Sequence, residues 1–161
     1  MRRVSGFTLI ELLVTVAVLA ILATVAVPGF QSLVASNRIV ADTNTLISGL
    51  HLARSEAVKR RAPVRFNPET EQPWGFSIVD NDGQVISQHR YDHGATQLSA
   101  SAASIEFNAL GRAPGCEARE CSVTLTPSND SVRGKRLSVE SSGRVTNEDA
   151  SKQDDYDEPG E

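Results

Sequence analysis

The stretch that decides the fold is "GFTLIELLVTVAVLAILATVAVPGF", residues 6–30. Its apolar part, residues 7–27, measures about 31 Å as a helix, which matches the hydrocarbon core of a bilayer. Two cations, Arg2 and Arg3, precede it. Because basic flanks stay on the cytoplasmic side of a membrane, the sequence predicts a spanning helix whose following residues are exported.

One acidic residue, Glu11, interrupts this apolar stretch. A charged side chain within a bilayer costs about 3 kcal/mol, so an intramembrane acid points to a function. A secretory signal peptide tolerates no acid near its start and needs a small-x-small cleavage site, for which "ATVAVPGF" is a weak match. A plain signal anchor is the other alternative, and it leaves Glu11 unexplained.

The segment "GFTLIE" resembles the class III signal of type IV pilins and type II secretion pseudopilins. The resemblance implies that a prepilin peptidase cuts after Gly6 and methylates the new N-terminus, Phe7. It also implies an assembly role for Glu11. Buried among apolar helices, this carboxylate needs a cation, and the N-terminal amine of a neighbouring subunit would supply it and set the filament register.

A helical pattern resumes after Pro28 and ends before Pro63. Its apolar stripe consists of Ile39, Thr43, Leu46, Leu50, Ala53 and Ala57. Four charged residues are expected off the stripe, namely Arg38, Asp42, Arg54 and Glu56. We therefore expect one helix from about Phe7 to Arg60, with the stripe of its second half packed on a domain.

Short β-like segments follow the helix, over residues 64–66, 74–80, 84–90, 104–111, 121–127 and 135–141. The sequence "DNDG" at residues 80–83 is a hairpin signal between two of them. The order of elements predicts an α+β fold in which a long N-terminal helix, transmembrane in its first half, packs on an antiparallel β-sheet. The pilin resemblance implies the same architecture.

These features divide the chain into a leader (1–6), a transmembrane and assembly helix (7–28), the second half of that helix (29–61), an antiparallel β domain (62–146) and a tail (147–161). The tail "NEDASKQDDYDEPGE" is acidic and lacks apolar periodicity, so we expect it to be disordered. The net charge of −4 for the 161 residues therefore conceals a weakly positive remainder.

Two cysteines, Cys116 and Cys121, stand close together in the sequence. A zinc site would need two further ligands, which the three scattered histidines do not obviously supply. The spacing favours a disulfide that closes a short loop, and hence an oxidising compartment. We expect no metal and no cofactor. The sequence also shows no nucleophile elbow and no phosphate-cradling glycine loop, so we do not expect an enzyme.

Longer blocks resemble the GspH/FimT-type minor pilins and minor pseudopilins, over about residues 6–146. They are "LVASNRIVADTNTLISGLHLARSEAVKRRAPV", "WGFSIVDNDG", "IEFNALGRA" and "RLSVESSGRV". The resemblance implies a FimT/FimU-like minor pilin of a type IV pilus, acting as a structural filament or tip subunit with other major and minor pilins. It also implies a single-pass protein of the bacterial inner membrane with its C-terminal domain in the periplasm. The alternative is the H-type minor pseudopilin of the type II secretion system.

A cluster of cations suggests an alternative of another class, a DNA-binding receptor for natural transformation. Its members are Arg133, Lys135, Arg136 and Arg144. Some FimT-like minor pilins bind DNA through a Gly-Arg-x-Arg motif, and the matching residues here are Gly143-Arg144-Val145-Thr146. Thr146 replaces the second arginine of that motif. The hypothesis requires the four cations to form one phosphate-binding patch.

Overall fold

The computed structural model describes residues 7–91, 94–117 and 121–150. Its elements, in chain order, are α1 (Leu9–Arg60), β1 (Val64–Glu69), β2 (Gly75–Asp80), β3 (Val85–Arg90), β4 (Thr96–Ala100), β5 (Ile105–Phe107), β6 (Ser122–Pro127), β7 (Lys135–Val139) and β8 (Val145–Asp149). The chain divides into two compact units, Met1–Val34 and Ala35–Glu161.

The first unit consists of the first half of α1. Its large apolar side chains point to all sides of the helix and are exposed, Leu9, Leu13 and Ile21 among them. A helix that is apolar all round is typical of a membrane span. Among the described residues, α1 is long and apolar enough to cross a bilayer. Pro28 lies inside α1, so the expected continuation of the helix past this proline is confirmed.

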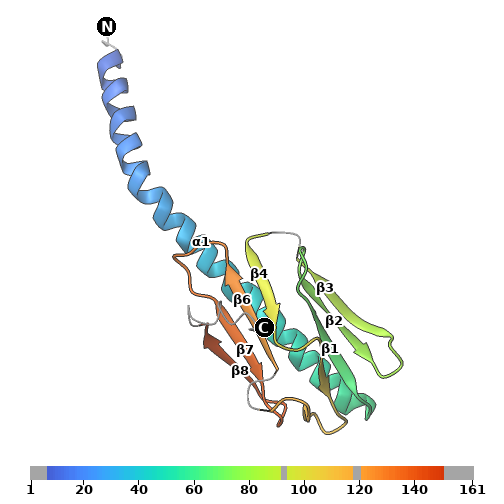
Figure 1. Cartoon of the computed structure of the whole chain (residues 1–161). Helices are drawn as coiled ribbons and strands as arrows, with labels where there is room; N and C mark the ends of the chain where they lie inside the picture. The colour runs from blue at the N-terminus through green and yellow to red at the C-terminus, as the bar shows by residue number, and fades with distance from the viewer. Residues whose placement is uncertain (1–6, 92–93, 118–120, 151–161) are drawn as a thin grey trace. The chain divides into compact units, whose positions relative to one another are not determined.

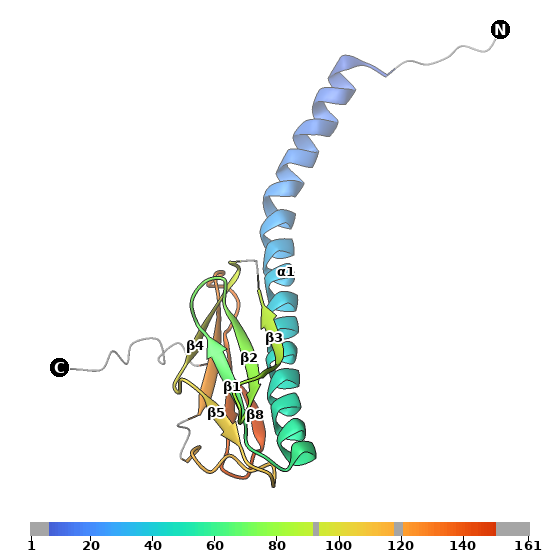
Figure 2. The ribbon, with the colours of Figure 1, turned by 90° about the vertical axis from the view of Figure 1, so that its right-hand side faces the viewer.

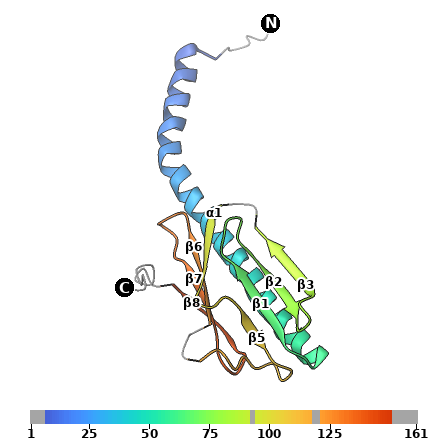
Figure 3. The same ribbon diagram turned by 45° about the vertical axis from the view of Figure 1, so that its right-hand side comes forward.

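The second unit holds two antiparallel sheets of four strands each, in the orders β3-β2-β1-β5 and β4-β6-β7-β8. Figures 1 and 3 show the two sheets beside each other. In Figure 2 both lie on the same side of the second half of α1. The expected α+β fold is confirmed, with two sheets in place of the single sheet that we expected. The hairpin predicted at residues 80–83 joins β2 to β3, and Gly83 donates its N–H to the carbonyl of Asp80 at 3.1 Å.

The β-like segments did not include β4 and β8. In β4, only Thr96 and Leu98 are buried, so the alternating pattern is too short to stand out. The strand β8 has the sequence "VTNED" and pairs with β7 along its whole length. The expectation that disorder begins at residue 147 is therefore wrong, because residues 147–149 belong to β8. Residues 151–161 lie outside the described part of the chain.

The core forms where α1 meets both sheets. The predicted stripe is confirmed, since Ile39, Leu46 and Leu50 are at most 1% exposed. Aromatic side chains of the first sheet pack against it, with the rings of Phe66 and Phe76 stacked at 4.9 Å between centroids. The second sheet adds its own buried residues, Val123, Leu125, Leu137 and Val139.

One expectation about the helix is wrong. Its position off the apolar stripe predicts an exposed Asp42, but this residue is 3% exposed. Sheets cover a wider arc of the helix than the stripe itself, so a polar residue beside the stripe is buried as well. Its carboxylate oxygen Oδ2 accepts a 2.9 Å hydrogen bond from the hydroxyl of Thr96, which satisfies one of the buried polar groups.

Candidate functional site

The first turn of α1 is closed by Thr8 and Glu11. The N–H and the hydroxyl of Thr8 donate to Oε2 of Glu11, at 3.0 and 2.9 Å. In return, the N–H of Glu11 donates to Oγ1 of Thr8 at 3.3 Å. This reciprocal pair is a capping box, in which a residue before the helix and the third helical residue satisfy each other's free N–H groups.

The capping box gives Glu11 a local role that our sequence reasoning missed. The signal was present, because Thr8-x-x-Glu11 is the sequence pattern of such a box. Both bonds that the carboxylate accepts use Oε2. Among the described residues, Oε1 accepts none. Phe7, which precedes the box, is 76% exposed, and the expected cleavage residue Gly6 lies outside the described residues.

Cys116 and Cys121 form a disulfide with a Cα–Cα distance of 5.1 Å. The two residues lie between β5 and β6, and both side chains are buried. The bridge closes a loop of four intervening residues just before β6. Because the loop is so short, the disulfide restricts only the chain just before β6 and contributes little to the stability of the rest of the core.

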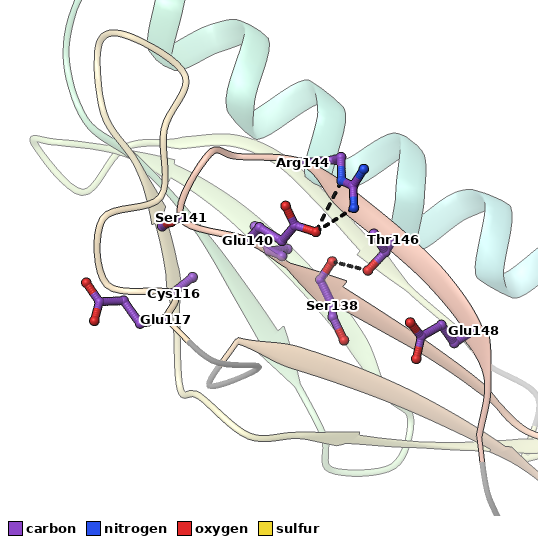
Figure 4. A pocket seen from close by; sticks show the side chains of 9 residues that line it. Cys116, Glu117, Ser138, Glu140, Ser141, Arg144, Thr146 and Glu148 are labelled. Atoms are coloured by element: carbon purple, nitrogen blue, oxygen red, sulfur yellow. Dashed lines mark hydrogen bonds and ion pairs between the residues drawn. The ribbon is translucent and has the colours of Figure 1, made fainter.

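The turn between β7 and β8 is closed by the backbone of Glu140 and Arg144. The N–H of Glu140 donates to the carbonyl of Arg144 at 2.9 Å, and that of Gly143 donates to the carbonyl of Glu140 at 2.7 Å. Gly143 adopts φ = +79°, a conformation that glycine reaches without strain. The guanidinium of Arg144 pairs with Oε1 of Glu140 at 2.7 Å, as Figure 4 shows. The glycine and arginine of the "SSGRV" block thus shape a hairpin turn.

The structure separates Arg144 from the other three cations that we expected in one patch. Lys135 pairs in register with Asp149 at one end of the β7–β8 hairpin, whereas Val139 pairs with Val145 at the other end. Arg144 precedes Val145 and is five residue steps from Asp149, so it lies about 17 Å along the strands from Lys135. Arg144 therefore lies apart from the other three cations, which share one end of the hairpin, and DNA binding stays a prediction.

Three of the four cations, Lys135, Arg136 and Arg144, are also paired with acids or bonded to other groups. Lys135 forms an ion pair with Asp149. The hydrogen bond that Lys135 donates to Asp149 lowers the pKa of the Asp149 carboxyl. The charge of Arg133 lowers this pKa further, by a smaller effect. Arg136 donates from Nε to Oγ1 of Thr124 at 3.4 Å and pairs in register with Glu148. A surface neutralised in this way attracts phosphates weakly.

A pocket of about 500 Å³ lies beside the β7–β8 hairpin and the disulfide loop (Figure 4). Its charged lining residues are Glu117, Glu140, Glu148 and Arg144, so carboxylates outnumber cations. Ser138 and Thr146 contribute polar groups and bond to each other across the strands, from the Thr146 hydroxyl to the Ser138 carbonyl at 3.3 Å. Within the described residues, no group of three or more His, Cys, Asp or Glu side chains is placed to hold a metal ion.

Comparison with known proteins yields two family matches. Residues 42–143 match the family described as type II transport protein GspH. Residues 1–27 match the prokaryotic N-terminal methylation motif. Two curated relatives, both fimbrial proteins of Pseudomonas aeruginosa, are 27% identical to this chain over 139 residues, covering 82% of this chain and 84% of each relative.

One solved structure shows the same fold. It is the crystal structure of the type IV minor pilin FimU of Pseudomonas aeruginosa, which superposes with a TM-score of 0.53. The alignment covers 75% of this chain and 90% of that chain, at 19% sequence identity. At this identity the comparison concerns the fold, a long helix packed on antiparallel sheets.

Proposed function

This chain belongs to the GspH family of type II transport proteins, and on that premise we propose that it is a minor pilin that takes part in assembling a type IV pilus. The observation that carries the proposal is the methylation motif over residues 1–27, set on a helix long enough to cross a membrane and continuous with a FimU-like fold. The motif implies processing by a prepilin peptidase. The peptidase would cut after Gly6 and methylate Phe7.

Membrane orientation follows from the charges and the cysteines. Arg2 and Arg3 would keep the leader in the cytoplasm of the bacterial cell, with the first half of α1 in the inner membrane. The second unit would then lie in the periplasm, where an oxidising environment preserves the Cys116–Cys121 disulfide. From this position the chain would enter the filament.

Filament assembly would use Glu11. Its Oε2 is engaged by the capping box, while Oε1 remains for a partner outside the described residues. In an apolar bundle, the methylated amine of a neighbouring subunit is the cation that would pair with it. The capping box would hold the carboxylate in place, because Thr8 fixes it to the first turn.

The partners in this proposal are the prepilin peptidase and other major and minor pilins. A structural role, and not an enzymatic one, fits the family and the fold. In the pocket of Figure 4, Arg144 and Glu140 form an ion pair, and Ser138 and Thr146 take part in strand pairing. The alternative within the same machinery is a minor pseudopilin of the type II secretion system, which the description of the GspH family favours.

The test compares a strain that lacks this chain with its parent. We expect surface pili to be lost or reduced, and antibodies to the chain to detect it in sheared filaments from the parent. Normal piliation together with periplasmic retention of secreted proteins would support the pseudopilin alternative. Normal piliation and normal secretion would contradict both.

A further inference from the structure

Two turns meet near the end of α1 in the second unit, the turn after β5 and the turn between β7 and β8. The N–H of Ala113 donates to the carbonyl of Ser141 at 3.1 Å. A Cβ placed on Gly143 would lie 2.0 Å from the carbonyl oxygen of Gly111. Nε of Arg54 lies 3.1 and 3.2 Å from the Cβ positions of the two glycines. The side chain of Arg54 therefore lies against the backbones of both turns.

Three arginines gather at this point, namely Arg54, Arg112 and Arg144, and we call this surface the arginine end. Arg144 is paired with Glu140. Among the described residues, the guanidinium groups of Arg54 and Arg112 have neither a carboxylate nor another hydrogen-bond partner. Arg54 is half-buried, and Arg112 is exposed. The arginine end thus offers two guanidinium groups, those of Arg54 and Arg112, that no carboxylate of the described residues pairs with.

An exposed apolar spot adjoins the arginine end. Leu110 precedes Gly111 in the turn and is 76% exposed. Val58 of α1 is 48% exposed, and its Cγ2 lies 3.1 Å from the Cβ position of Gly111. Apolar side chains bordered by unpaired arginines fit an apolar or aromatic residue that is flanked by acids.

The chain itself contains such a segment, and we propose that residues 151–161 dock on the arginine end of the same molecule. The segment includes "DDYDE", residues 154–158, in which Tyr156 stands between two pairs of acids. Tyr156 would cover Leu110, and the acids would pair with Arg54 and Arg112. These residues lie outside the described part of the chain, and it is their composition and their length that suit them to this surface.

The extended length of residues 150–156 matches the distance from Ala150 to Arg144. Ala150, the last described residue, donates its N–H to the carbonyl of Gly134 at 3.0 Å, at the end of the hairpin opposite Arg144. From Arg144 to Ala150 there are six residue steps of extended chain, or about 20 Å. Six steps also separate Ala150 from Tyr156, so a segment that runs back along the hairpin brings Tyr156 level with Arg144. Attachment to the same chain gives a high effective concentration, which compensates for weak individual contacts.

Docking of this kind depends on salt, because exposed charges are screened within about 3 Å at 1 M ionic strength. The test uses the full-length chain in detergent micelles, labelled with ¹⁵N and carrying a nitroxide on Gly160→Cys. The introduced thiol is labelled selectively because the two native cysteines are joined in a disulfide. At low salt we expect the amide signals of Gly111, Arg112 and Gly143 to lose more than half of their intensity, and to recover it at 1 M NaCl.

Two variants make the test specific. The double variant Arg54→Gln with Arg112→Gln should abolish the broadening, whereas Arg133→Gln, at the opposite end of the hairpin, should leave it unchanged. Absence of broadening at low salt, or broadening that neither salt nor the double variant reduces, would overturn the proposal. A mixture of nitroxide-labelled ¹⁴N protein and unlabelled ¹⁵N protein provides the last check. Broadening in that mixture would assign the contact to a second copy and overturn docking within one molecule.

Discussion

The indole N–H of Trp74 donates a 3.1 Å hydrogen bond to the hydroxyl oxygen of Thr96, across the boundary between the two sheets. The hydroxyl of Thr96 in turn donates to Asp42 on α1. Trp74, Thr96 and Asp42 are each at most 3% exposed. One buried hydroxyl therefore ties the helix to both sheets, and the indole ring is stacked on Tyr91 at 3.9 Å between centroids.

Replacing the hydroxyl of Thr96 should destabilise the folded protein. Thr96→Val keeps the shape of the side chain but leaves the indole N–H and the Asp42 carboxylate without their partner in the core. Leaving two buried polar groups unsatisfied should lower the free energy of unfolding by about 3 kcal/mol, measured by chemical denaturation of the full-length chain in detergent. Thr126→Val, at an exposed position of β6, is the matched control and should change it by less than about 0.5 kcal/mol. Equal effects of the two changes would contradict a structural role for the network.

Gly143→Ala should destabilise the protein more than Gly83→Ala. Both glycines have positive φ, +79° and +80°, so an alanine is strained at either position by about 1 kcal/mol. At Gly83 the new Cβ would meet nothing within 4 Å, whereas at Gly143 it would lie 2.0 Å from the carbonyl oxygen of Gly111. Thermal unfolding of both variants measures the difference. A loss at Gly143 no larger than at Gly83 would show that the two turns are not in contact.

The stability of the helix end should depend on pH through Glu56. A hydrogen bond from Arg60 at 2.8 Å, and then one from Lys59 at 3.0 Å, hold the pKa of the Glu56 carboxyl below its ordinary value. The folded pKa is thus lower than the unfolded value of about 4.3, so this stabilisation is complete above that pH and is lost as pH falls through the folded pKa. The free energy of unfolding, measured from acid to neutral pH, should fall at acid pH. Glu56→Gln should make this dependence on pH less steep. The same dependence on pH in the parent and in Glu56→Gln would contradict a contribution from the Glu56 carboxylate.

Mass spectrometry of the protein from its native membrane should find a methylated Phe7 at the N-terminus. Substitution of Gly6 by a bulky residue should leave a longer, unmethylated precursor in the inner membrane, because the peptidase could not cut. A mature protein that begins at Met1, or that is cut near Ala26, would contradict the pilin proposal.

Glu11→Gln separates the two roles of this residue. Glutamine retains an acceptor for the N–H of Thr8, so the capping box persists, but the charge that would attract a neighbouring amine is removed. We expect Glu11→Gln to insert into the membrane as well as the parent and to be lost from sheared filaments, as measured by immunoblotting of both fractions. Thr8→Val is the complementary control, because it removes the capping hydroxyl and keeps the charge. Normal incorporation of Glu11→Gln would leave capping as the role of this carboxylate.

Local patterns of sequence are sufficient to predict several features of the fold. The length of the helix and its stripe at Ile39, Leu46 and Leu50 follow from apolar periodicity, which is a property of neighbouring residues. The β2–β3 hairpin follows from the turn residues 80–83 for the same reason. The strand β8 was missed because "VTNED" has the composition of a solvated tail, and only its pairing with β7 makes it a strand.

By itself the sequence determined a membrane-length helix, a methylation motif at its start and an α+β domain after it, because each depends on residues within a few turns or strands of chain. Tertiary structure decided which polar side chains are buried and which cations share a surface. Asp42 is buried because two sheets close over one helix, and Lys135 and Arg144 are separated because strand register places them at opposite ends of a hairpin. Such outcomes depend on pairing between residues that are distant in sequence, which no local pattern of charge or hydrophobicity encodes.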